Sequence, residues 1–308
     1  MTDHSKIIGI ASALGATLCW GSGTLMSKDI LDIFPPTLLL VVQIFCSVVL
    51  LWVFVIIRLQ THPLRLMPLS IREIAAFASL GILEPGMAYL LGLIGLVHVD
   101  ASDAVIIQAS ESMMIVLLSI VIYGIIPRMR FVFLLVISFI GLYLALKSPS
   151  GVTPSQAVNF GYLLIFLGTA AAALYVVISG KYAAKYDPAF IVACQQTVAL
   201  IFALMLLPMG LDDFSTLNDV NANWQAWLYA GFSGVVQYAL AFSLYMVALR
   251  HIGANISGSF LNLIPVFGLT GAVLFLNETL TMLQLIGTGM TIIAVALVNV
   301  EHLKTEKP

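Results

Sequence analysis

Residues 81–101 read GILEPGMAYLLGLIGLVHVDA, and residues 234–254 read GVVQYALAFSLYMVALRHIGA. At a fixed offset of 153 residues the two stretches match without a gap at glycine, alanine and histidine positions. The same register extends in both directions, through the pairs Gly15/Gly168, Lys28/Lys181, Pro35/Pro188, Gln43/Gln196, Gly81/Gly234, Ala88/Ala241, His98/His251, Ala101/Ala254 and Met129/Met282. Leucine and alanine recur by chance in apolar sequence. Matches of glycine, lysine, proline, glutamine and histidine in one unbroken register are much harder to explain by chance. The chain is therefore predicted to be duplicated, with domains at 1–150 and 151–308.

The composition is typical of a membrane protein. Of the 308 residues, 61% are hydrophobic and 9% are charged, whereas soluble domains are about 45–50% apolar and about 25% charged. So few charged side chains cannot coat a soluble protein of this length, so lipid is the expected solvent. The net charge of -2 argues against a nucleic-acid partner, which would require a basic face. The three cysteines lie in apolar runs, and no disulfide framework is expected.

Ten stretches are long and apolar enough to cross a bilayer, which requires about 20 mostly apolar residues. They cover 7–27, 36–57, 74–97, 101–123, 129–147, 160–180, 189–211, 225–249, 254–276 and 281–300. Spans three and four, and spans eight and nine, are separated by very short connections, which predicts tight helical hairpins. The expected fold class is an all-α integral membrane protein, with ten transmembrane helices arranged as two inverted five-helix repeats.

The inversion follows from the odd number of spans in each half. Inverted repeats are typical of secondary transporters, because the two halves can exchange conformations around a site at the membrane midplane. Lysine and arginine favour the cytoplasmic side of short loops. With a cytoplasmic N-terminus, all of the 13 basic residues except Lys28 and Lys147 fall on that side. We expect a multi-pass plasma-membrane protein (the inner membrane in a bacterium) with both termini in the cytoplasm.

Two acidic side chains fall deep in the expected spans. Glu84 lies near the middle of the third span and Glu111 near the middle of the fourth. A charged residue at the centre of a membrane helix costs about 2.5–3.5 kcal/mol on insertion scales, so such residues usually face protein or water. Glu84 shares a helix face with Gly81 and Ala88, which places it in the bundle, and Pro85 should bend or loosen the helix. Both carboxyls are candidate substrate-binding or proton-carrying groups; the alternative is a buried interhelical bond.

Further side chains are candidates for lining the same substrate and proton pathway. Gln108 shares a helix face with Glu111, and Gln237 is the repeat partner of Glu84. Asn262 belongs to the polar stripe of the ninth span. The aromatic candidates are Trp20, Tyr89, Tyr175 and Tyr238, with Tyr245 a further one. Aromatic residues in membrane helices more often pack or anchor at the interface, so this alternative stays open for each of them.

Motifs for other chemistry are absent from the sequence. There is no HExxH helix, no paired-cysteine motif and no G-x-S-x-G elbow. No catalytic residue, metal or cofactor is therefore expected. The longest connections, 148–159 and 212–224, are too short for a soluble domain, so a gradient or the substrate's own concentration difference must supply energy. The expected partners are a small-molecule substrate, protons as candidate coupling ions, and the lipid bilayer; a homodimer is left open.

The first and last helices carry a family resemblance. Cys19-Trp20-Gly21-Ser22-Gly23, followed by Lys28, resembles the opening helix of EamA-type members of the drug/metabolite transporter superfamily. The closing segment resembles that family's signature of proline, then Gly-Glu-x-Leu, then Gln-x-x-Gly, through Pro265, Leu276-Asn277-Glu278-Thr279-Leu280 and Gln284-Leu285-Ile286-Gly287. The resemblance covers essentially the whole chain. It implies a ten-helix carrier with a central cavity lined by both halves, in a family whose members include exporters of amino acids and other metabolites.

The first half departs from the family signature, with Ser112 and Ile125 at the offsets of the proline and the acid. The resemblance therefore does not imply a particular substrate. Glu278, at the start of the last span, is interpreted as a structural carboxylate that stabilises the N-terminus of that helix.

We expect a secondary transporter that exports a small organic metabolite, amino-acid-like or otherwise amphipathic, by alternating access around a midplane cavity. Two other classes stay open. One is a polytopic membrane enzyme that uses the buried carboxylates, although the sequence offers no nucleophile or metal site beside them. The other is a non-transporting membrane receptor or scaffold, which such short loops make less favourable.

Overall fold

The computed structural model describes residues 3–61, 70–123, 129–146, 155–183, 185–209 and 224–305. Every regular element in these ranges is a helix. The predicted domain boundary at 150/151 and the basic residues Arg65, Arg128 and Lys147 lie outside the described residues, so the structure does not test them.

The elements of the first half are α1 (Asp3–Ile30), α2 (Pro36–Thr61), α3 (Ile71–Ala78), the π-helix η1 (Ile82–Met87), α4 (Ala88–His98), α5 (Ala101–Gln108), α6 (Glu111–Tyr123) and α7 (Met129–Leu146). Those of the second half are α8 (Gln156–Ala183), α9 (Pro188–Leu206), the short η2 (Leu207–Met209), α11 (Trp224–Gly234), the π-helix η3 (Val235–Leu240), α12 (Ala241–Phe260), the 3-10 turn η4 (Leu261–Leu263), α13 (Ile264–Phe275) and α14 (Met282–Thr305).

Seven helical segments are long and apolar enough to cross a membrane. They are Lys6–Ile30, Pro36–Arg58, Ile71–His98, Ala101–Ile122, Gln156–Ala183, Pro188–Leu206 and Trp224–Ile252. Two shorter apolar helices follow, at Ile264–Phe275 and Met282–Ala294. Large apolar side chains lie exposed on the outside of these helices, among them Phe45, Phe54 and Phe275. Such a surface is stable in lipid and not in water. The chain is therefore an all-helical, multi-pass membrane protein.

The helix boundaries repeat at the offset found in the sequence. Shifted by 153 residues, α1 coincides with α8 at both ends, and η1 coincides with η3 at both ends. The packing repeats as well, because α1 packs on α12 in the same way that α8 packs on α4, the repeat counterpart of α12. The two copies therefore share local structure and helix contacts, and the matches between glycine, proline and histidine positions report a structural duplication.

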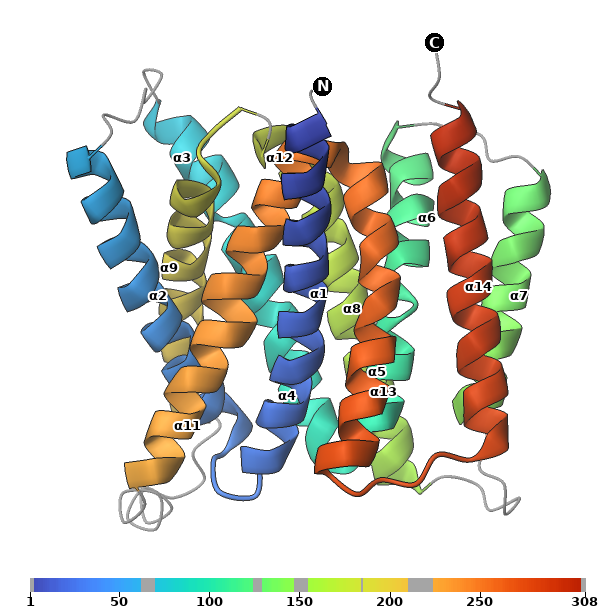
Figure 1. Cartoon of the computed structure of the whole chain (residues 1–308). Helices are drawn as coiled ribbons and strands as arrows, with labels where there is room; N and C mark the ends of the chain where they lie inside the picture. Colours follow the sequence, from blue (N-terminus) through green and yellow to red (C-terminus); the bar gives the residue numbers. More distant parts are fainter. Residues whose placement is uncertain are drawn as a thin grey trace.

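The two copies of the first helix run in opposite directions. Lys28, near the end of α1, donates hydrogen bonds to the carbonyls of Leu96 and Val99 at the end of α4. Gly161, near the start of α8, packs on Gly95 and His98 at this same end of α4. Figure 1 shows α1 descending from the top of the bundle, while α14 runs upward and also ends at the top. The first and last described helices thus begin and end on one face of the bundle.

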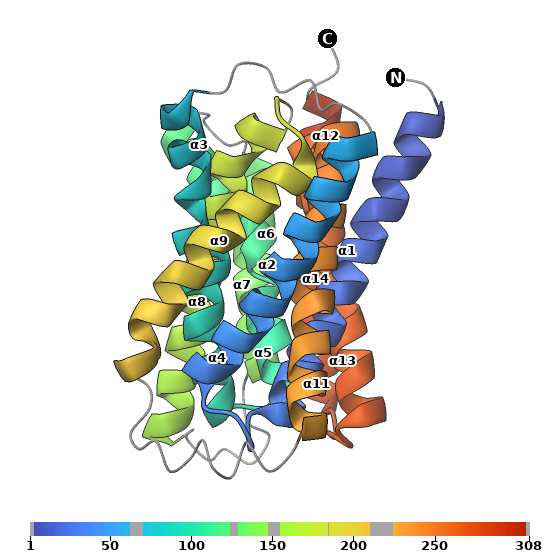
Figure 2. The same ribbon diagram turned by 90° about the vertical axis from the view of Figure 1, so that its left-hand side faces the viewer.

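The helices form a flattened bundle. In Figure 1, α2 and α9 lie together at one edge, α7 and α14 lie together at the other, and the remaining long helices fill the middle. Figure 2, turned by 90°, shows α9 and α2 side by side on the face toward the viewer. The buried core lies between these edges, and it includes Phe34, Leu39, Tyr238 and Phe242.

Two membrane-crossing segments of the first half are interrupted near their middle. Glu84 has a non-helical backbone (φ -147°, ψ 126°) just before Pro85, so the predicted loosening of the helix at this proline is confirmed. The second break, a turn at Ala109 and Ser110 between α5 and α6, was not predicted. The second half carries η3 and η4 near the same repeat positions. Broken helices leave backbone groups and polar side chains available at mid-membrane, which transporters use for binding.

Both predicted hairpins are present in the structure. The connection between α4 and α5 is confirmed as tight, since α4 ends at His98 and α5 begins at Ala101. The second hairpin is confirmed as well, although α12 is assigned as helical throughout Ala241–Phe260. Ile252 lies against Gly9 near the start of α1, whereas Ile264 lies against Gly21, further along the same helix. The chain therefore reverses direction between these two residues, as the short connection predicted.

Glu278 is structural, but the prediction of its partner helix was wrong. Asn277 has a left-handed backbone (φ 55°), and the amide of Glu278 donates to the carbonyl of Ala272, which ends α13 in a Schellman-type cap. The turn directs the Glu278 carboxylate toward α5, where it accepts hydrogen bonds from the amides of Ala101 and Ser102, each at 3.0 Å. The start of α14 is capped instead by Thr281 and Gln284.

Substitution of Glu278 by Ala is expected to destabilise the protein by about 1 kcal/mol, the usual effect of losing an N-terminal cap. Asp100, at the N-cap of α5, makes no side-chain cap bond, so no other side chain caps these two amides. The measurement is thermal unfolding of the detergent-purified protein. Glu278→Gln, which keeps one acceptor oxygen, should fall between Ala and wild type. If the Ala variant unfolded at the same temperature as wild type, Glu278 would not have this stabilising role.

Candidate functional site

A cavity of about 80 Å³ lies between the broken helices. One water molecule requires roughly 10–15 Å³ on this measure, so the cavity has room for several waters or a small solute. Its wall is built by side chains from both halves of the chain. The polar and aromatic members are Trp20, Thr24, Ser27, Glu84, Tyr89, Gln108, Glu111, Thr169, Tyr175, Gln237 and Tyr245.

Both predicted carboxyls lie in this wall. Glu84 is 7% exposed and sits at the non-helical position between α3 and α4, while Glu111 begins α6 just after the second break. The two groups are close enough to interact electrostatically. Their position at helix breaks follows from the sequence locally: Pro85 cannot donate a hydrogen bond, which frees the turn beside Glu84. Neither carboxyl faces lipid.

Close packing of α4 on α8 brings Glu84 to the cavity. A side-chain carbon at Gly168 would press on the carbonyl of Ala88, and one at Gly95 would press on the carbonyl of Gly161. The small-residue stripe predicted on the third span therefore packs closely against a neighbouring helix. Ala88 and Gly92, which share that stripe with Glu84, also line the cavity.

Gln237 joins the cavity to a buried polar network. The Ser27 hydroxyl donates to Gln237 Oε1 at 3.0 Å. Gln43 Nε2 donates to Ser27 Oγ at 3.0 Å and to Ser233 Oγ at 2.8 Å, and its carbonyl accepts from the Tyr238 hydroxyl at 3.3 Å. All of these bonds except the one between Gln43 and Ser27 cross from the first half of the chain to the second. They fix the amide of Gln237 at the cavity wall. Gln237 occupies the position in the second repeat that Glu84 occupies in the first.

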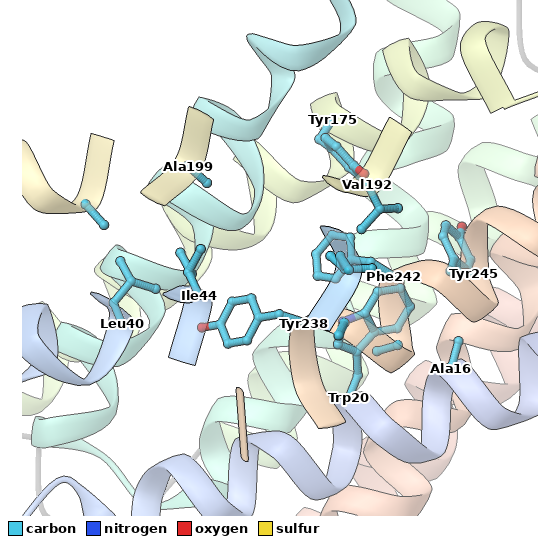
Figure 3. Packing of buried hydrophobic residues seen from close by; sticks show 14 of the residues in the cluster. Ala16, Trp20, Leu40, Ile44, Tyr175, Val192, Ala199, Tyr238, Phe242 and Tyr245 are labelled. Carbon is cyan, nitrogen blue, oxygen red and sulfur yellow. The ribbon is translucent and has the colours of Figure 1, made fainter. Parts of the chain in front are cut away.

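Aromatic rings form the apolar side of the cavity. Trp20 contacts Phe242 and Tyr245 edge-on, with ring centroids 5.3 Å and 5.2 Å apart. Figure 3 shows these rings gathered with Tyr175 between the helices. The Tyr175 hydroxyl donates to Gln195 Oε1 at 2.8 Å, so its polar tip is already engaged.

The structure brings seven of the nine predicted residues to one cavity. The seven are Trp20, Glu84, Tyr89, Gln108, Glu111, Tyr175 and Gln237. Tyr238 is buried against Phe242 and is absent from the cavity lining; in Figure 3 its hydroxyl points away from Trp20, toward Ile44. The side chain of Asn262 lies outside the described set, although Leu261 and Ile264 on either side of it line the cavity.

Three hydroxyl residues of the wall were not among the predicted site residues: Thr24, Ser27 and Thr169. Thr24 and Ser27 follow Trp20 by four and seven residues, so helical periodicity places all three on one face. That spacing was a usable signal. Thr169 has no such signal, because its neighbours in α8 are alanine and glycine.

The cavity is nearly symmetric in backbone and asymmetric in charge. Glu84 and Gln237 occupy equivalent repeat positions, as do Glu111 and Ile264, and all four line the wall. Both acids therefore come from the first half of the chain. Among the described residues, no group of three His, Cys, Asp or Glu side chains lies close enough to hold a metal ion.

Polar contacts tie the helices together beside one end of the cavity. Lys28 Nζ donates to the carbonyl of Leu96, a wall residue, at 2.9 Å. Asp103, next to the wall residue Ala104, accepts hydrogen bonds from the Tyr162 hydroxyl at 2.7 Å and from Gln284 Nε2 at 3.2 Å. These bonds connect α1 to α4, and α5 to both α8 and α14.

Two curated bacterial proteins are similar in sequence to about half of the chain. The threonine/homoserine exporter RhtA of Escherichia coli (strain K12) is 30% identical over 165 residues, which cover 52% of this chain and 51% of the relative. The uncharacterized transporter YcbK of Bacillus subtilis (strain 168) is 28% identical over 154 residues, 49% of each chain. The chain thus matches about half the length of these curated relatives.

A solved crystal structure covers 100% of this chain and 100% of its own, with a TM-score of 0.68 and 15% sequence identity, so it supports the fold alone. The EamA-like transporter family matches residues 7–147 and again residues 159–300. The two matches cover nearly the whole chain and fall on the two repeats. This is a family of transporters and not of enzymes. The chain belongs to the EamA-like transporter family of multi-pass membrane proteins.

Proposed function

We propose that this protein is a secondary transporter that exports a small, amino-acid-like metabolite across the plasma membrane. The observation that carries the proposal is the mid-bundle cavity, which holds Glu84 and Glu111 among aromatic rings and amides from both repeats. Carboxyls attract an ammonium group, rings bind apolar carbon, and the amides and hydroxyls fit a polar substituent. The similarity to an exporter named for threonine and homoserine favours the same substrate class and direction.

Alternating access would use ten crossings as two inverted five-helix halves, at 1–150 and 151–308, with both termini in the cytoplasm. The antiparallel courses of α1 and α8 and the repeated helix breaks support this arrangement. Opening of the end beside Leu96 would require the Lys28 bonds, and the bonds of Asp103 to Tyr162 and Gln284, to separate. Closure of the opposite end would accompany it.

Transport by the reconstituted protein tests this function. Proteoliposomes are loaded with unlabelled L-threonine, L-homoserine or another neutral L-amino acid, and entry of the labelled compound is followed with and without a proton gradient. We expect counterflow of at least one amino acid above that of protein-free liposomes, and acceleration by the gradient. Counterflow no greater than in protein-free liposomes for the whole panel would refute the amino-acid class. Equal rates with and without the gradient would refute proton coupling.

A further inference from the structure

Two hydrogen-bond donors in the cavity wall have no partner among the described residues. They are the indole Nε1–H of Trp20 and the hydroxyl of Tyr245. Both side chains are more than nine-tenths buried, with exposed fractions of 8% and 1%. The Tyr89 hydroxyl lies near the Trp20 indole, but the contact lacks the geometry of a hydrogen bond. In the described part of the chain three other buried hydroxyls also lack partners, and none of them lines the cavity.

An unpartnered buried donor is unfavourable. Such a donor loses its hydrogen bonds to water without replacement, and native proteins satisfy nearly all of their buried donors. Here two such donors line one cavity, and their rings touch with centroids 5.2 Å apart. Trp20 belongs to α1 and Tyr245 to α12, helices that pack on each other along their length. Both rings are therefore held in place, and the missing partner is expected to be a molecule in the cavity.

The charge of the wall limits what that molecule can be. Trp20 and Tyr245 offer hydrogen-bond donors, so they fit an oxygen acceptor. Glu111 lines the same cavity as Trp20 and Tyr245. A carboxyl there fits a cation close to the acceptor oxygen. An α-amino acid carries this pair, with its ammonium and carboxylate attached to one carbon.

We propose that Trp20 and Tyr245 bind the carboxylate of a zwitterionic substrate while Glu111 binds its ammonium group. This inference rests on the proposed transport function and specifies how the cavity recognises its substrate. It distinguishes the zwitterion from the corresponding amine, which leaves both donors unsatisfied. Hydrogen bonds to a charged group contribute about 1.5–3 kcal/mol, which corresponds to a preference of roughly tenfold or more.

Two matched pairs of compounds test this recognition. L-homoserine is compared with 3-aminopropan-1-ol, and L-threonine with 1-aminopropan-2-ol; each amine is the amino acid without its carboxylate. Competition by each compound against counterflow is measured in proteoliposomes. In wild type we expect the amino acid to compete about tenfold better than its amine. In Trp20→Phe and Tyr245→Phe, which keep a ring and lose the donor, this ratio should fall toward one.

Tyr175→Phe is the matched control. Tyr175 also lines the cavity, but its hydroxyl already donates to Gln195, so its loss should lower thermal stability and leave the selectivity ratio at the wild-type value. If ordered water satisfies Trp20 and Tyr245 instead, the Phe variants will keep the wild-type ratio, and the inference is wrong while transport stands. Equal competition by amine and amino acid in wild type would also overturn it. Absence of any amino-acid counterflow in wild type would overturn the proposed function itself.

Discussion

Replacement of Glu84 by Gln is expected to abolish acceleration by a proton gradient while substrate exchange continues. Glutamine has the size and hydrogen-bonding groups of a protonated carboxyl but cannot release a proton. Glu84 lies at the break between α3 and α4, where a change of backbone can move it relative to the cavity. Because counterflow moves no net protons, it does not require the carboxyl to titrate. Gradient-driven uptake in the variant should fall to the rate of wild type without a gradient.

Glu111→Gln is expected to behave differently from Glu84→Gln. If Glu111 binds the substrate ammonium, its loss should slow both counterflow and gradient-driven transport, by roughly tenfold or more at low substrate concentration. Both assays are carried out on the same liposome preparations, and the amount of inserted protein is measured for each variant. Identical behaviour of the two variants would contradict the division of roles between the carboxyls.

Glu73→Gln is the matched control for both variants. Glu73 lies in α3 outside the cavity, where it accepts from Lys185 at 2.9 Å and from Tyr186 at 2.8 Å. Its side chain is 38% exposed, and exposed ion pairs contribute about 0–1 kcal/mol. The Glu73 variant should therefore keep gradient-driven transport. A loss of coupling in this variant as well would show that the effect is not specific to the cavity.

The carboxyl sites were predictable because charge and periodicity act together in a membrane helix. An acid at mid-span must avoid lipid, and the stripe formed by Gly81, Ala88 and Gly92 showed which face of the helix turns inward. Periodicity does not exclude Tyr238 in the same way, because neighbouring residues such as Ala88 and Tyr89 both line the cavity. Tyr238 instead packs on Phe242 and donates a hydrogen bond to Gln43, and these contacts come from the assembled bundle.

The break between α5 and α6 was not predictable from local sequence. Neither Ala109 nor Ser110 is a proline or a glycine, so no residue of the turn marks it as a helix break. Glu278 shows the same limit. Its hydrogen bonds to Ala101 and Ser102 join residues more than 170 positions apart, and the left-handed turn at Asn277 determines their direction. Local patterns locate helices and their inward faces, whereas partners at long range require the assembled bundle.

Replacement of Gly81 or Gly234 by Val is expected to disrupt folding more than any change at the cavity. A Cβ at Gly81 would fall far inside van der Waals contact with the carbonyl of Gln195, and one at Gly234 would do the same at the carbonyl of Gln43. Each of these contacts is with backbone, which cannot rotate away as a side chain can. Overpacking of side chains alone costs about 1–3 kcal/mol, so the effect here should be at least that large.

The position of these two glycines makes the effect general to the fold. They occupy equivalent positions in the two repeats, and each directly precedes a π-helix. Gly81 in the first half packs on α9 of the second half, and Gly234 in the second half packs on α2 of the first half. A larger residue would therefore separate the halves at the edge of the bundle. Gly289→Ala is the control, because a Cβ there meets nothing within 4 Å. In detergent, the Val variants should melt at lower temperature or aggregate, while Gly289→Ala should elute as wild type and melt at the wild-type temperature or above it, because alanine favours the helix more than glycine does. A normal melt of Gly81→Val would mean that α9 does not pack this closely on the Gly81 backbone.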